Sequence, residues 1–200
     1  MQNKKLAIAV TGNIGSGKTT FCDYLSSKNY PVIKADDLSK QILATNKDVR
    51  NAIIKEFGKE SFKGDEVNKK FLAEKVFSNP ENVILINSIL HPQVIEETKK
   101  LITQFHKNND IVFVEAALIY EADMEEIFDY VVLISADLDL RLNRKHTETK
   151  INLIELVNRD KNQIPDEEKK KRADFNFIND GSIKDLQKKA DLLIMLLKAL

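Results

Sequence analysis

The chain has 200 residues, of which 42% are hydrophobic and 31% charged, and its 31 basic residues balance 31 acidic ones. This length suits one domain, or one core with an inserted subdomain, and the composition excludes a disordered or fibrous chain. A net charge of zero provides no overall field for nucleic acid or an anionic membrane, so we expect neither partner and expect any anion site to be local.

The N-terminal segment "MQNKKLAIAV" has no long apolar stretch and no small-residue cleavage site, which predicts a cytoplasmic protein. The apolar runs along the chain are also too short to span a membrane. Cys22 is the single cysteine, so the chain cannot form an internal disulfide. Its position in an amphipathic segment favours a small residue of the core.

Short apolar runs without alternation recur along the chain and are separated by helical patterns. Such runs are typical of strands that are buried on both faces of a sheet. The predicted strands are 6–10, 30–36, 110–120, 128–135 and 174–178. Strands that alternate with helices in this way indicate an α/β fold with a doubly wound, five-stranded parallel sheet.

Two helical stretches are longer than this fold needs. One, at about 47–106, is a candidate acceptor-binding subdomain, and the other, at about 137–172, is a candidate lid. The remaining core comprises 1–46, 107–136 and 173–200. Because ligands of open α/β sheets bind beyond the carboxyl ends of the strands, where both stretches begin, both can close over one site.

Several residues mark helix ends in the first stretch and before it. Asp36 and Asp37 are candidate N-caps for the helix after the second strand. Glycines at 58 and 64 predict a turn between two helices. Pro80 is expected to open another helix, which His91-Pro92 should break or kink.

The sequence "GNIGSGKTT" follows the first predicted strand and precedes a helix from Gly17 to about Lys28. It fits the phosphate-loop pattern G-x4-G-K-[ST]. Glycines let successive N–H groups turn toward phosphate oxygens, and the helix presents its N-terminus to the same anion. The expected nucleotide-binding residues are Gly12, Asn13, Ile14, Gly15, Ser16, Gly17, Lys18, Thr19 and Thr20.

In this pattern Lys18 reaches the β- and γ-phosphates, and the Thr19 hydroxyl ligates Mg²⁺. Glu115 ends the strand that usually carries the magnesium carboxylate in such proteins, so it could hold a metal-bound water. The alternative for Glu115 is a satisfied polar residue at a strand end, whereas Glu121 is more typical of a helix start. We therefore expect ATP or GTP with Mg²⁺.

Phosphoryl transfer also needs a carboxylate near the acceptor hydroxyl and cations on the migrating charge. Asp36 could serve as the base, and a helix cap is the alternative role for it. Arg141, Arg144 and Arg159 could belong to a lid that excludes water, although a solvated helix face accounts for each of them as well. The run "KKKR" at 169–172 is expected to be solvated surface, with contact to the nucleotide as an alternative role for Arg172.

Together these features resemble the dephospho-coenzyme A kinase family over nearly the whole chain. The segments that carry the resemblance are "TGNIGSGKTT", "VIKAD", "LHPQV", "EAALIYE", "DYVVLIS", "RLNRK", "NRDKNQ" and "ADFNFINDGSIKDL". The family transfers the γ-phosphate of ATP to the ribose 3′-hydroxyl of dephospho-CoA, the last step of CoA biosynthesis. The resemblance implies a core of the type described above, with a helical CoA-binding subdomain and a lid.

The resemblance also implies roles for single residues. Asp36 corresponds to the aspartate that activates the acceptor hydroxyl, and Arg141 and Arg144 match the arginines that open the lid. These arginines, Lys18 and Mg²⁺ would stabilise the transferring phosphoryl group. Arg159 and Gln163 match the R-x-x-x-Q of the family, and Asn179, Asp180 and Gly181 match the loop after the last strand, which lies near the adenine in such folds, although these three also suit an ordinary turn. The implied nucleotide-binding residues are Arg159, Asn179 and Gly181, and the implied acceptor-binding residues are His91 and Glu115.

Three positions depart from the family pattern. Lys34 replaces an acid that often precedes "AD", "ALIYE" lacks the proline of "PLLFE", and the segment between Arg144 and Arg159 has an unusual sequence. His91 has two possible roles, a contact with an acceptor phosphate or a place at a helix kink.

Two other functions compete with this one. Another small phosphate-loop kinase, acting on a nucleoside or nucleotide, would have no room for a pantetheine arm, whereas the long stretch at 47–90 favours a larger acceptor. A nucleotide-dependent switch would need a guanine-reading N-K-x-D, and "NKDV" at 46–49 fails because its fourth residue is Val49. We expect a small-molecule kinase that is a monomer or a small homo-oligomer.

Overall fold

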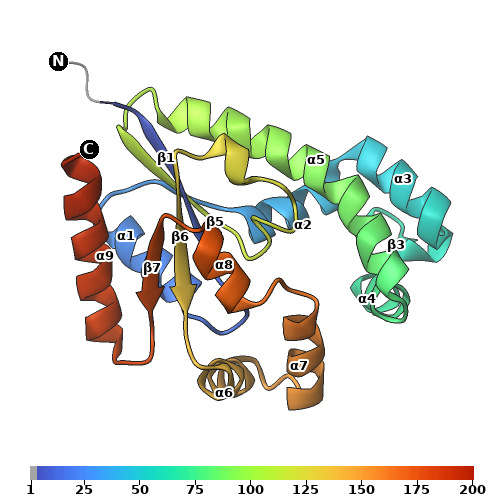
Figure 1. The fold of residues 1–200 in the computed structure, drawn as a ribbon. Coiled ribbons are helices and arrows are strands. Elements are labelled where there is room, and N and C mark those ends of the chain that lie inside the picture. The colour runs from blue at the N-terminus through green and yellow to red at the C-terminus, as the bar shows by residue number, and fades with distance from the viewer. Residues whose placement is uncertain (1–3) are drawn as a thin grey trace. The chain divides into compact units, whose positions relative to one another are not determined.

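The computed structural model describes residues 4–200, and its centre is a five-stranded sheet (Figure 1). The strands, in their order across the sheet, are β2 (Val32–Lys34), β5 (Ile111–Glu115), β1 (Leu6–Thr11), β6 (Tyr130–Ser135) and β7 (Phe175–Ile178). Every neighbouring pair is parallel. The predicted doubly wound parallel sheet is therefore confirmed, with each strand shorter than or similar to its predicted run.

Both faces of the sheet are buried, as the unpatterned apolar runs predict. On one face, Ile8 and Val10 of β1 pack with Phe21 of α1 (Lys18–Ser27) and Leu193 of α9 (Ile183–Lys198). Cys22 belongs to the same cluster and is fully buried. Figure 1 shows α1 and α9 side by side against the central strands. This packing holds α1 against β1, with the loop of residues 12–17 between them.

The chain divides into two compact units, and the first comprises residues 1–34 and 102–200. Besides the sheet, α1 and α9, its helices are η2 (Glu125–Ile127), α6 (Leu138–Thr149), α7 (Leu153–Lys161) and α8 (Asp166–Arg172). Sequence analysis places the lid at about 137–172, and α6, α7 and α8 fill that range.

The second unit comprises Ala35–Leu101. Its elements are α2 (Ala35–Thr45), α3 (Lys47–Phe57), η1 (Lys59–Ser61), β3 (Phe62–Lys63), β4 (Glu66–Val67), α4 (Lys69–Phe77) and most of α5 (Pro80–Phe105). The unit begins at Ala35, earlier than the predicted boundary at 47, because α2 packs on α3 and β4.

Three sequence-based expectations for this unit are wrong in detail. Glycines 58 and 64 do not mark a simple turn between helices, because the antiparallel hairpin β3–β4 lies in that segment. The predicted break in α5 at Pro92 is wrong, because this residue lies inside the helix, whereas the alternative of a kink stays a prediction. Asp36 and Asp37 are not caps but first-turn residues of α2, where the helix dipole still favours their charge.

No helix within residues 4–200 is long and apolar enough to cross a membrane. This agrees with the short apolar runs of the sequence.

The buried thiol of Cys22 gives a direct test of the core packing. Burial raises the pKa of this thiol well above its usual range, so the reactive thiolate is scarce as well as inaccessible. We expect no reaction with a thiol-specific chromogenic reagent in the native protein, and one thiol per chain after denaturation. Rapid labelling of the native protein would contradict this packing.

Candidate active site

The backbone of the phosphate loop turns sharply between β1 and α1. Gly15 has φ 76° and Gly17 has φ 99°, a region that other residues rarely adopt. A Cβ on Gly15 would lie 2.1 Å from the carbonyl oxygen of Arg141, and one on Gly17 would lie 2.3 Å from the Asn179 side-chain nitrogen. The two glycines are therefore required both for the turn and for the close approach of neighbouring segments.

The N-terminus of α1 is open to an anion. Gly17 is the N-cap and supplies no side-chain cap, so the first N–H groups of the helix have no partner within it. The Lys18 ammonium folds back over the loop and donates to the carbonyls of Gly12 at 2.7 Å and Asn13 at 3.3 Å. The buried Ser16 hydroxyl has no hydrogen-bond partner among the described residues. These groups fit the oxygens of a polyphosphate.

Thr19 and Glu115 meet beside this loop. The Thr19 hydroxyl donates to a carboxylate oxygen of Glu115 at 2.6 Å. Glu115 is only 9% exposed, and it pairs in register with Val10 of β1 and Lys34 of β2. A hydroxyl and a carboxylate are the donor types of a hard divalent cation, which completes its shell with water and phosphate oxygens. The two residues that were each predicted at the metal are therefore in direct contact, and their binding of the metal stays a prediction.

No group of three or more His, Cys, Asp or Glu side chains in residues 4–200 could hold a metal ion. A magnesium site built from Thr19, Glu115, waters and phosphates needs no such group.

Arg141 is buried in contact with the backbone of the phosphate loop. It is 4% exposed, and its guanidinium donates to the carbonyl of Ile14 at 3.0 Å and to Asp160 at 2.6 Å. It also lies 3.7 Å from Asp166, whose pKa is raised by burial although the guanidinium opposes this. Arg141 is therefore enclosed within the protein.

The other predicted lid and tail residues make separate contacts. Arg144 donates to the carbonyl oxygens of Asn179 at 2.8 Å and Gly181 at 3.5 Å. The Asn179 amide in turn donates to the carbonyl of Ser16 at 2.8 Å, which joins the tail to the phosphate loop. Arg159 pairs with Glu155 at 2.6 Å, one turn earlier on α7.

Asp36 and His91 belong to the second unit. Asp36 is exposed in the first turn of α2, two residues after β2 ends at Lys34. Its neighbour Asp37 forms an ion pair with Lys40 at 2.7 Å. His91 is half-buried within α5.

A buried ion pair involves Lys169 of the segment predicted as a lid, and the sequence did not reveal it. Lys169 is not solvated surface: it is 0% exposed and lies 3.0 Å from Glu121, which is not at a helix start. The α8 helix contacts β6 but contains only charged residues, so the long stem of Lys169 fills the position of an apolar side chain. A run of identical charges offered no signal for this.

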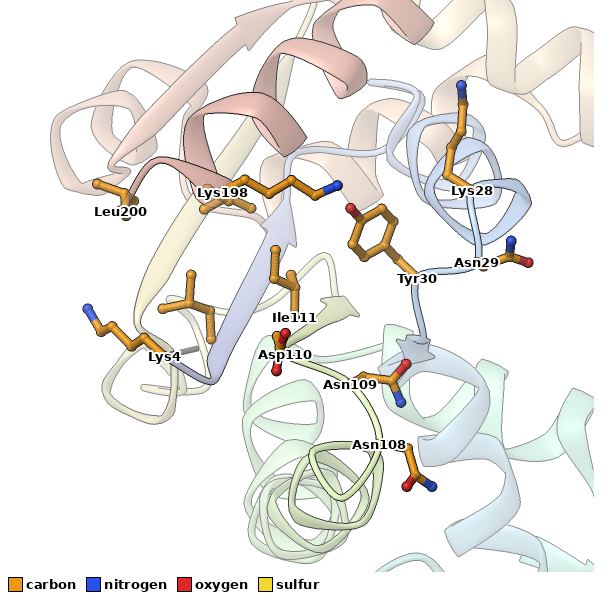
Figure 2. A pocket seen from close by; sticks show the side chains of 12 residues that line it. Lys4, Lys28, Asn29, Tyr30, Asn108, Asn109, Asp110, Ile111, Lys198 and Leu200 are labelled. Atoms are coloured by element: carbon orange, nitrogen blue, oxygen red, sulfur yellow. The ribbon is translucent and has the colours of Figure 1, made fainter. Parts of the chain in front are cut away.

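A surface pocket of about 790 Å³ lies at the other end of the sheet, where β1 and β5 begin (Figure 2). Lys4, Lys28 and Lys198 line it, and α1 and α9 both end there. Lys28 caps α1 and Lys198 ends α9, and the C-terminal end of a helix stabilises a cation, which accounts for these two lysines. The pocket is distinct from the phosphate loop, which follows the opposite ends of these strands.

Comparison with known proteins decides between the kinase classes. The sequence model of the dephospho-CoA kinases matches residues 6–185. The chain belongs to the dephospho-CoA kinase family. It is 33% identical to the dephospho-CoA kinase of Bacteroides fragilis over 177 residues, which cover 88% of this chain and 85% of that protein.

Solved structures agree with this assignment. A protein from Thermus thermophilus is similar with a TM-score of 0.80 and 29% identity, over 97% of this chain and 98% of the other. The dephospho-CoA kinase from Campylobacter jejuni gives a TM-score of 0.73 and 29% identity, over 96% and 97% of the two chains.

Membership of the dephospho-CoA kinase family confirms the predicted activity. The protein is a transferase that uses ATP to phosphorylate dephospho-CoA, a small-molecule substrate, in CoA biosynthesis. The two competing predictions, a kinase of another class and a nucleotide-dependent switch, are therefore set aside.

Alanine at Gly15 tests the geometry of the phosphate loop. Gly15→Ala places a Cβ against the Arg141 backbone, whereas Gly64→Ala, at φ 59°, meets nothing within 4 Å. Both changes carry the cost of a left-handed backbone, about 1 kcal/mol. We expect only Gly15→Ala to weaken ATP binding, by about tenfold or more. Equal ATP affinities in the two variants, measured by calorimetry, would contradict the described loop.

Proposed function

We propose that the phosphates of ATP bind the loop from Gly12 to Thr20, with Lys18 at the β- and γ-phosphates. The support is the open N-terminus of α1, together with the inward-turned ammonium of Lys18 and the buried hydroxyl of Ser16. A cation at this point attracts the oxygens on which charge accumulates during phosphoryl transfer.

The same proposal assigns Mg²⁺ to Thr19 and, through a bound water, to Glu115. It rests on the 2.6 Å hydrogen bond between the two side chains, which is the single observation that best distinguishes a nucleotide site from an ordinary glycine turn. When bound there, Mg²⁺ neutralises charge on the phosphate oxygens. Because Glu115 is mostly buried, neighbouring atoms restrict its carboxylate to a position beside Thr19.

Asp36 is proposed as the general base for the ribose 3′-hydroxyl of dephospho-CoA. Its carboxylate is exposed in the first turn of α2, directly after the end of β2, and is therefore accessible to an acceptor hydroxyl. His91 of the same unit is proposed to contact dephospho-CoA.

The cations of the lid are given different roles. Arg144 and Arg159 are half-buried and are proposed to approach the nucleotide, with Asn179 and Gly181 near its base. Arg141 is proposed to act from beneath the loop, because its guanidinium is already enclosed by carboxylates and carbonyls.

The sharpest test of this function is Asp36→Asn. The amide cannot accept the acceptor proton, so turnover should fall by roughly 10²-fold or more while ATP affinity is retained. Asp37→Asn is the matched control, since Asp37 is exposed in the same helical turn and pairs with Lys40. Turnover is measured as CoA formed from ATP and dephospho-CoA.

Normal turnover in Asp36→Asn would remove Asp36 from the mechanism and leave it a first-turn helix residue. An equal loss in both variants would show that the charge of the helix start matters, and not a specific base.

A further inference from the structure

The N–H and the carbonyl of Ile14, in the middle of the phosphate loop, each form a hydrogen bond with a side chain from residues 137–172, the predicted lid. Its N–H donates to the Gln163 side-chain oxygen at 2.9 Å, and its carbonyl accepts from Arg141 at 3.0 Å. The neighbouring Asn13 amide donates to the carbonyl of Ile164 at 3.2 Å. These three hydrogen bonds form a clamp that binds the first half of the loop to residues about 130 to 150 positions later.

The arginine of this clamp is itself fixed in place. Arg141 donates through Nε to the carbonyl of Ala136 at 3.1 Å and through one terminal nitrogen to Asp160 at 2.6 Å. Asp160 and Asp166 are also mostly buried, so the charges are poorly screened by water. Hydrogen bonds between ionised groups are strong and directional, so Asp160 determines where the guanidinium points.

The backbone next to Gln163 is also held by hydrogen bonds. Ile164, the residue after Gln163, donates its N–H to Glu121 at 2.8 Å. The same Glu121 oxygen lies 3.0 Å from the buried ammonium of Lys169, which also donates to the carbonyl of Ala117 at 3.2 Å. The segment between α7 and α8 is therefore tied to the chain that leaves β5.

We propose that Asp160 and Gln163 are positioning residues that hold the phosphate loop ready for ATP, Asp160 through Arg141 and Gln163 directly on Ile14. The inference rests on the proposed binding of ATP phosphates by this loop. A loop that is already ordered loses less conformational freedom on binding, so its affinity is higher. Neither residue has to touch dephospho-CoA or the reacting atoms.

The proposal predicts a selective loss of ATP affinity. Gln163→Met keeps the length of the side chain but removes the acceptor for the Ile14 N–H, and should raise Kd for ATP by about tenfold. Asp160→Leu should do at least as much, and Asp160→Asn, which keeps an acceptor oxygen, should be intermediate. KM for dephospho-CoA should stay within about twofold of wild type.

Two control variants match these changes. Glu148→Gln is the control for Asp160, because the Glu148 side chain on α6 is 68% exposed. Gln104→Met is the control for Gln163, because Gln104 is an exposed glutamine of α5. Both should leave the affinity for ATP unchanged. Kd is measured by calorimetry with a non-hydrolysable ATP analogue and Mg²⁺, and KM by CoA formation on the intact protein.

The outcomes distinguish a clamp on the loop from a general structural role of the two residues. Unchanged ATP affinity in Gln163→Met and in Asp160→Asn would overturn the inference, as would an equal rise in KM for both substrates. If Asp160→Leu does not fold, the Gln163→Met variant still tests the inference, because Gln163 is only half-buried. A wild-type protein that does not bind ATP would instead overturn the proposed function.

Discussion

The parallel register of β1 with β5 is the constraint on which the site depends. It places Val10 opposite Glu115, so that the carboxylate of β5 lies level with the start of the phosphate loop. The hydrogen bond from Thr19 then follows, since α1 begins where the loop ends. A shift of one residue in this register would turn Glu115 to the other face of the sheet.

The phosphate loop depends on long-range contacts as much as on its glycines. The glycines permit the turn, but the hydrogen bonds that hold it come from Arg141, Gln163 and Asn179. These residues lie on three segments that reach the loop only because β6 and β7 extend the sheet beside β1. The segment predicted as a lid therefore supports the loop, and its Arg141 and Lys169 form buried ion pairs with Asp160 and Glu121 respectively.

Local patterns predicted the strands and the position of the phosphate loop because the residue types that form them recur in short stretches of sequence, although long-range contacts hold both in place. Continuous apolar runs identify buried strands, and the spacing of Gly12, Gly17 and Lys18 identifies the loop. Thr19 and Glu115 were each predicted at the magnesium ion from the loop pattern and the strand end, but their direct contact was not predicted. The roles of single residues, including Asp36, remain predictions.

Features set by tertiary packing could not be predicted in the same way. The charge run that contains Lys169 resembles solvated surface, and only the contact of α8 with the sheet buries that ammonium. Two-residue strands such as β3 and β4 have no detectable period. The helix α5 continues through Pro92 although a proline removes one hydrogen bond of the helix, so the sequence alone did not indicate this continuity. The partnership of Arg141 with Asp160 likewise joins two separate helices.

The most direct test of this account is the product of one reaction. The intact protein is incubated with ATP, Mg²⁺ and either dephospho-CoA or its 3′-deoxy analogue, and the acceptors are analysed by mass spectrometry. The account predicts one added phosphoryl group on dephospho-CoA, at catalytic turnover, and none on the analogue. Phosphorylation of both acceptors, or of neither, would contradict transfer to the ribose 3′-hydroxyl.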